Sequence, residues 1–204
     1  MTNKAGVFII ILFIHLTNVA FTLITDDWEL AKEKKGVTIY TRSIEGQKIK
    51  EFKAFITIDA DIEKIVEIIN DDDNIKDWQK NTKGGQLLKE INNNEMYSYV
   101  EIGMPWPMSD RDIVFHRTIS KKEDGSILIH LDSAPQYYDD QDGYVRMNTV
   151  SGDWELTPTS DNKIEIRYQF FGDPEVKLPN WILNMFIVDG PYETLLALKE
   201  LAEA

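Results

Sequence analysis

Residues 37–58 hold two runs in which β-branched and aromatic residues alternate with polar ones, the pattern of half-buried β-strands. The runs are VTIYTRSI and KIKEFKAFITI, with Gly46 in the turn between them. Further strands are predicted at about 84–91, 95–103, 110–121, 126–133, 144–157 and 163–172. Short turns rich in Asn, Asp and Gly separate several of these runs, so successive strands are expected to pair antiparallel.

Three other segments have helical patterns. Residues 26–36, DDWELAKEKKG, carry acids first and lysines last, with Gly36 as a stop, which predicts a short helix. In residues 59–78, Asp59 or Asp61 is a suitable N-cap for apolar residues at helical spacing. These apolar residues are Ile62, Ile65, Val66 and Ile69.

Residues 180–203 predict one long final helix of roughly 36 Å, at 1.5 Å per residue. Gly190-Pro191 is expected to kink it. One buried stripe is predicted from the spacing i, i+4, i+7, i+11, i+14: Trp181, Met185, Val188, Tyr192 and Leu195. The whole order predicts an α+β fold in which a curved antiparallel sheet wraps around this amphipathic helix.

Residues 25–204 are predicted to be a single domain, because no repeat or flexible linker divides them. Before them, residues 1–24 have an early lysine, an apolar stretch and then small and polar residues, the layout of a secretory signal peptide. An uncleaved N-terminal membrane anchor is the alternative. Either reading places the domain outside the cytoplasm, as a secreted or periplasmic protein.

Charge and cysteine content narrow the range of partners and chemistry. The formal net charge is −13 and the pI is about 4.6, which argues against a nucleic-acid partner. The absence of cysteine excludes disulfides, thiol catalysis and Cys-ligated metals.

The strand at 110–121 carries an arginine among apolar residues. Alternation places Arg117 on the same face as Ile113 and Phe115, a face that is expected to point inward. An unpaired buried guanidinium is unfavourable, so Arg117 requires a carboxylate, a water-filled cavity or a ligand headgroup. Glu101 on the preceding strand is the nearest candidate partner. An ion pair at the edge of the core, or an arginine that reaches solvent, remains the alternative.

The inward faces of the strands and of the final helix together supply the candidate ligand-binding residues. These are Arg117, Phe115, Ile113, Glu101, Tyr99, Ile129, Leu131, Tyr168, Phe170, Met185 and Val188.

Several motifs resemble those of START domains, the steroidogenic-acute-regulatory-related lipid-transfer domains of the SRPBCC (Bet v 1-like) superfamily. The segment 106–117, with WPMSDRD and VFHR, is similar to the family's hallmark. GVTIYTR, IKDW, GYVRM, GDWELTP and DPEVKLPNWILN resemble further family segments. The resemblance extends over most of residues 25–204.

The resemblance implies a helix-grip fold, with a U-shaped antiparallel sheet around the final helix enclosing a hydrophobic cavity for a sterol, phospholipid or other lipid. It puts Arg117 where several members have a charged residue facing the tunnel. Glu175 and Val176 replace the family's paired glycines, so the loop before the last helix is expected to differ. Residues 133–143 are a candidate lid, and the first half of the last helix is a candidate for transient membrane-surface contact.

The predicted function is therefore binding, with transfer as a further expectation, of a lipid or other hydrophobic ligand without catalysis. Residues suited to catalysis are scarce: His116 and His130 lie on outward strand faces, and no nucleophile elbow, metalloprotease motif or phosphate loop is found. The acidic segments at 70–74 and 139–143 lack full calcium-loop spacing. No catalytic residue, cofactor or metal ligand is predicted.

Two alternatives remain at this point. A helix-grip enzyme, such as a cyclase or hydrolase acting on a hydrophobic substrate, needs a polar pair facing the cavity, and convergence of Glu101, Tyr99 and Arg117 within hydrogen-bond reach would favour it. An interaction module with no cavity requires a completely packed interior.

Overall fold

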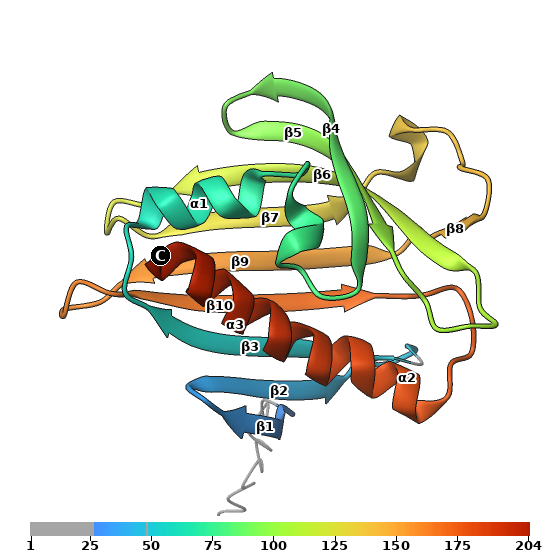
Figure 1. The fold of residues 1–204 in the computed structure, drawn as a ribbon, viewed down its shortest axis with the longest axis horizontal. Helices are drawn as coiled ribbons and strands as arrows, with labels where there is room; N and C mark the ends of the chain where they lie inside the picture. Colours follow the sequence, from blue (N-terminus) through green and yellow to red (C-terminus); the bar gives the residue numbers. More distant parts are fainter. Residues whose placement is uncertain (1–26, 48) are drawn as a thin grey trace, which may run out of the picture.

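The computed structural model describes residues 27–47 and 49–204, so the predicted signal peptide or anchor at 1–24 lies outside the described residues. Ten strands in the described chain form one strongly curved sheet in the order β1-β2-β3-β10-β9-β7-β6-β5-β4, with β8 paired parallel to β6 (Figure 1). All other pairs are antiparallel. The bounds are β1 Glu29–Lys34, β2 Val37–Ser43, β3 Lys50–Ile58, β4 Thr82–Asn92, β5 Glu95–Ile102, β6 Asp110–Lys121, β7 Ile127–Ser133, β8 Tyr144–Arg146, β9 Val150–Pro158 and β10 Ile164–Gly172.

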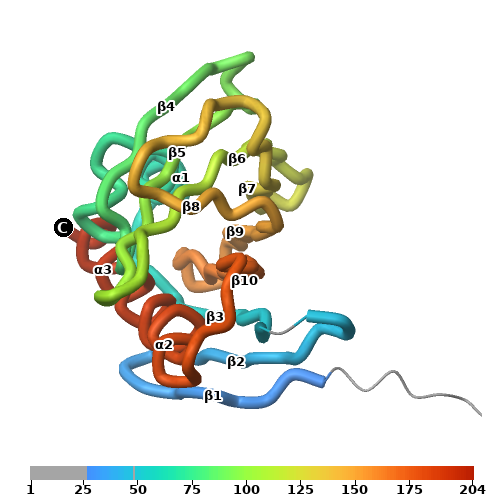
Figure 2. The backbone as a smooth tube through the Cα atoms, turned by 90° about the vertical axis from the view of Figure 1, so that its right-hand side faces the viewer, coloured from blue at the N-terminus to red at the C-terminus, as the bar shows by residue number. Residues whose placement is uncertain are grey.

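The helices lie on the concave side of this sheet (Figure 2). Helix α1 spans Ile62–Asn70 and is capped by Asp61, whose carboxylate accepts a 2.8 Å hydrogen bond from the Glu63 N–H. The final helical segment consists of α2 Asn180–Asn184, a π-helical turn Met185–Asp189 and α3 Gly190–Glu203. Short 3₁₀ turns occupy Ile75–Asp77 and Pro135–Tyr137. The arrangement confirms the α+β helix-grip prediction.

The predicted helix at 26–36 is wrong, because this segment forms strand β1. Lys35 and Gly36 both adopt positive φ, 50° and 78°, in a tight turn that folds β1 back against β2. The Arg42 guanidinium lies over the Trp28 ring, 4.6 Å from its centroid, in a cation–π contact. Glu29 forms a salt bridge with Lys50 at 2.6 Å. Pairing with the free edge of β2 therefore outweighs the local charge pattern that favours a helix.

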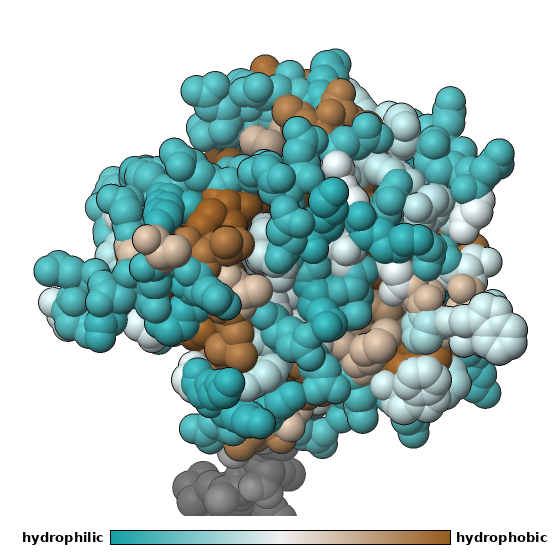
Figure 3. Space-filling view, viewed as in Figure 1, coloured by the Kyte–Doolittle hydropathy of each residue, from teal (hydrophilic) through white to brown (hydrophobic). Residues whose placement is uncertain are grey.

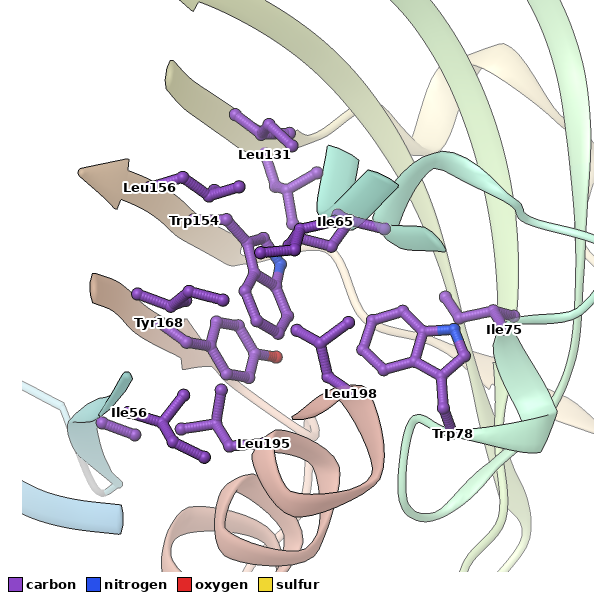
Figure 4. Packing of buried hydrophobic residues seen from close by; sticks show 14 of the residues in the cluster. Ile56, Ile65, Ile75, Trp78, Leu131, Trp154, Leu156, Tyr168, Leu195 and Leu198 are labelled. Atoms are coloured by element: carbon purple, nitrogen blue, oxygen red, sulfur yellow. The ribbon is translucent and has the colours of Figure 1, made fainter. Parts of the chain in front are cut away.

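The interior is well packed at the C-terminal end of α3. Figure 4 shows Leu195 and Leu198 pointing from α3 toward Trp154 and Tyr168 of the sheet. The rings of Trp154 and Tyr168 stack with their centroids 3.8 Å apart, and Trp78 meets Trp154 edge-on at 5.9 Å. The helix and the sheet therefore meet directly along this half of the concave face.

The stripe predicted for the final helix is only partly correct. Leu195 is fully buried as expected, but Trp181 is 62% exposed, and the buried residue of α2 is Ile182. The reason is the π-helical turn, in which the Gly190 N–H donates to the Met185 carbonyl and widens the helix by one residue. A regular α-helical spacing continued through the π-helical turn therefore assigns the wrong residues to the buried face of the helix. Among the described residues, no helix has the length and apolar character needed to cross a membrane.

Candidate functional site

A cavity of about 120 Å³ remains at the other end of the concave face, between the sheet and the start of the final helix. Its roof comes from α2, the π-helical turn and the first turn of α3. Its walls come from β3, β5, β6 and β10 and from the loops that follow β5 and β10. Most lining residues are apolar: Ile49, Phe52, Val100, Ile102, Met104, Ile113, Phe115, Met147, Tyr168, Phe170, Pro174, Leu178, Leu183, Phe186, Ile187 and Pro191.

Aromatic rings form one continuous wall of the cavity. Phe52 meets Tyr168 edge-on at 5.0 Å, and Phe115 meets Phe170 at 6.3 Å. Phe170 can lie flat here because its cross-strand neighbour is Gly152, where an added Cβ would come within 2.5 Å of the ring. Burial raises the pKa of the Tyr168 hydroxyl, which therefore stays neutral and can donate a hydrogen bond.

Arg111 is the buried charge on the cavity wall. Its Nε donates to the Pro174 carbonyl at 2.9 Å, and its Nη1 donates to the Ser109 carbonyl at 2.5 Å. Burial lowers the pKa of this guanidinium, and the neighbouring charge of Asp110 opposes the shift. The Asp110 carboxylate accepts hydrogen bonds from Lys83 Nζ at 2.5 Å and from the Met104 N–H at 2.8 Å.

Arg117 lies outside this cavity and is paired. Its Nη2 donates to Asp72 Oδ1 at 2.6 Å, its Nη1 donates to Asn70 at 3.3 Å, and Asp72 Oδ2 accepts from Ser98 at 2.6 Å. Both side chains of the Arg117–Asp72 pair are almost completely buried. Arg117 therefore forms a buried ion pair with Asp72, and the candidate partner Glu101 does not contact it.

Comparison with known proteins places this geometry in a family. The START domain family model matches residues 21–195. The chain belongs to the START domain family. It is 34% identical to an uncharacterized protein of Pseudomonas aeruginosa over 185 residues, 91% of each chain, and 24% identical to mouse phosphatidylcholine transfer protein over 80% of this chain and 78% of that one. It also superposes with a TM-score of 0.80 on a STAR-related lipid transfer protein fragment from Xanthomonas axonopodis, 31% identical, over 88% of this chain and all of that one.

Two further candidates on strand β5 of this START domain lie on its convex side. Tyr99 and Glu101 stand opposite Val114 and Asp112 in the β5–β6 register, whereas the concave positions are Met96, Ser98 and Val100. Burial raises the pKa of the Tyr144 hydroxyl, and its hydrogen bond to Glu101 adds to the shift. The prediction that Tyr99 and Glu101 face the cavity is wrong, because the inward parity on β5 belongs to the even-numbered residues.

The remaining candidates divide between the cavity wall and the packed core. Ile113, Phe115, Tyr168 and Phe170 line the cavity. Ile129 and Leu131 belong to the hydrophobic core instead, where the end of α3 and helix α1 fill the concave side. Met185 and Val188 are not among the lining residues, since the π-helical turn presents Phe186 and Ile187 there.

The segment at 133–143 is not a lid over the START cavity. It packs on the convex side of β5 and β6, where Tyr137 stacks on Tyr97 with the ring centroids 3.5 Å apart. Arg146 holds it by donating to the carbonyls of Pro135 at 3.0 Å and Tyr138 at 2.8 Å, while pairing with Asp112.

The loop before α2 retains a glycine-like backbone despite its sequence. Glu175 adopts φ +59°, a conformation that favours glycine. Its N–H donates a hydrogen bond to the Asp173 carboxylate at 2.9 Å. A left-handed conformation costs a non-glycine residue roughly 1–2 kcal/mol. The loop therefore accommodates Glu175 at a conformational cost and still carries Pro174 to the cavity wall.

Proposed function

We propose that this START domain binds one lipid or other hydrophobic molecule in the cavity between its sheet and its final helix, and carries it between membranes without altering it. The observation that carries the proposal is the apolar cavity roofed by α2 and the π-helical turn. Family membership and the similarity to a phosphatidylcholine transfer protein support it.

The size of the cavity requires the roof to move when a ligand enters. Pockets for small molecules measure roughly 300–1,000 Å³, larger than the 120 Å³ found here. Burying ten methylene groups contributes roughly 8 kcal/mol before the costs of association, which can offset the opening of a short helical segment. Segment α2 has one buried residue, Ile182, and the π-helical turn has none, so this roof has few core contacts to break.

The arrangement of polar side chains supports a carrier over an enzyme. The convergence of Glu101, Tyr99 and Arg117 that would favour an enzyme does not occur, since the first two face away from the cavity. The third alternative, an interaction module with a filled interior, would need the cavity beneath α2 to be packed as tightly as the core around Leu198.

The cavity end of the molecule also has the features of a membrane-contact surface. Trp106, in the loop between β5 and β6, is 92% exposed, and Trp181 of α2 is 62% exposed. Both elements lie at the same end of the molecule (Figures 1 and 2), and Figure 3 shows hydrophobic side chains at the surface between their positions. Tryptophan is favoured at the interface between lipid and water, so this end is proposed to rest on the membrane during exchange.

Replacing both tryptophans with serine is expected to weaken binding to lipid vesicles by at least about tenfold, because each buried aromatic side chain is worth roughly 1.5–3 kcal/mol. Vesicle co-sedimentation measures this loss. The matched control is Leu87→Ser, which removes a 48% exposed apolar residue from strand β4. An equal loss in the control, or no loss in the double variant, would contradict the proposed surface.

The place of action is proposed to be outside the cytoplasm, on the strength of the apolar leader in residues 1–24. Fractionation of cells expressing the full chain, followed by N-terminal sequencing of the product, tests this. A cytoplasmic protein with its first residues intact would contradict it.

Carriage itself is tested with fluorescent phospholipids in donor vesicles, unlabelled acceptor vesicles and the purified protein. The proposal predicts transfer that increases with protein concentration, with the lipid recovered chemically unchanged. Absence of both transfer and a stable complex with every lipid class offered would contradict it.

A further inference from the structure

We infer that the hydrophobic ligand of this cavity carries an acidic group, a carboxylate or a phosphate, that pairs with Arg111. The inference rests on the proposed lipid-binding function and narrows it to one chemical class of ligand. It follows from the charges along the cavity wall, from the hydrogen bonds of Arg111 and from the contrast between Arg111 and the other two buried arginines.

The charged residues that line the cavity are basic, although the chain as a whole is acidic. The protein has 35 acidic and 22 basic residues, yet the cavity is lined by Lys50, Lys80 and Arg111 and, among the described residues, by no aspartate or glutamate. Lys50 and Lys80 are part-exposed and pair with Glu29 and Glu193, each at 2.6 Å. Arg111 is therefore the buried charged residue of the cavity wall that is available to pair with a ligand.

Arg111 differs from the other buried arginines in the partners it has. Arg117 pairs with Asp72 at 2.6 Å, and Arg146 pairs with Asp112 at 2.9 Å. Within residues 27–47 and 49–204, Arg111 forms no ion pair, although it is only 4% exposed. A buried cation with no carboxylate in direct contact is unfavourable, and an anionic ligand group beside it would supply that contact.

The hydrogen bonds of Arg111 also orient it for such a group. Nε and Nη1 are held by the carbonyls of Pro174 and Ser109, which fixes the plane of the guanidinium against the wall. Nη2 forms no hydrogen bond to the described residues. A carboxylate or phosphate oxygen entering the cavity would find a charged donor that is already positioned, and charge-assisted hydrogen bonds of this kind are the strong ones.

The Pro174 contact links the ligand to the roof of the cavity. Pro174 lies in the loop that leads from β10 into α2, so Arg111 connects the wall strand β6 to the segment that has to open. An anion bound at Arg111 lies next to the base of this segment.

The test compares ligands that share an acyl chain and differ only in the headgroup. Oleate is compared with oleyl alcohol, dioleoyl phosphatidic acid with dioleoylglycerol, and inorganic phosphate serves as an anion without a chain. Affinity for each is measured by displacement of a fluorescent lipid from the purified protein. The variants are Arg111→Met, Arg111→Lys and, as a loss of one positive charge from an exposed position on α1 outside the cavity, Lys64→Met.

The inference predicts that the wild-type protein binds each acidic lipid at least tenfold more tightly than its neutral partner. Arg111→Met should reduce this preference to less than about twofold, and Lys64→Met should keep it. Inorganic phosphate alone should not displace the probe. The wild-type comparison does not depend on the folding of any variant.

Equal wild-type affinity for acidic and neutral lipids would overturn the inference and leave the lipid carrier standing. So would a preference that survives in a folded Arg111→Met protein. Failure of the wild-type protein to bind any of these lipids would instead overturn the proposed function itself, so the two failures are distinguishable.

Discussion

Replacing Arg117 with methionine is expected to lower the free energy of unfolding by about 3–5 kcal/mol, because the change leaves Asp72 as an unpaired charge in the interior. The two side chains are 4% and 2% exposed, so water cannot replace the lost partner. Urea denaturation followed by tryptophan fluorescence measures the change. The remaining contact of Asp72 with Ser98 would be too little to compensate.

The double variant Asp72→Asn with Arg117→Met is the matched control. It removes both charges, and the asparagine still accepts the hydrogen bond from Ser98, so it should recover a large part of the stability lost in the single variant. A single variant within about 1 kcal/mol of wild type would show that the pair is not needed for folding. A double variant no better than the single one would show that the effect is not electrostatic.

Replacing Ile113 with tryptophan is expected to abolish lipid binding by filling the cavity. Ile113 is 3% exposed and its side chain forms part of the wall, so the larger indole ring must enter the 120 Å³ space or displace the roof. Affinity for any bound lipid should fall by at least about tenfold, since the buried chain loses several methylene contacts worth about 0.8 kcal/mol each. Fluorescent-lipid titration measures the loss.

Val145→Trp is the matched control for this change. Val145 lies in β8 on the outside of the sheet and is 38% exposed, so the same ring is added without entering the cavity. Its lipid affinity should stay within about twofold of wild type. Unchanged affinity in a folded Ile113→Trp protein would place the ligand elsewhere on the molecule.

The strands could be predicted from the sequence because side-chain alternation directly reflects which face is buried. The inward parity of β6 and β10 identified Ile113, Phe115, Tyr168 and Phe170, all of which line the cavity. The same parity, continued back two residues from Ile113, would also have identified Arg111.

Other features depend on contacts that no local pattern records. The partner of Arg117 is Asp72, which lies 45 residues away and reaches it only because the turn after α1 packs over β5 and β6. Strand β1 has helix-like charges but pairs with the free edge of β2. The π-helical turn before Pro191 shifts the register of the final helix, so the lining residues Phe186 and Ile187 replace the expected Met185 and Val188.

One lipid per chain is expected to occupy the space beneath α2 and the π-helical turn. Native mass spectrometry of the protein, purified from a lipid-containing source, tests this most directly. It should show one lipid bound per chain, with the adduct retained in Val145→Trp and lost in Ile113→Trp. A wild-type protein that carries no lipid, even after incubation with acidic and neutral lipids, would contradict the account, as would an adduct that persists unchanged in Ile113→Trp.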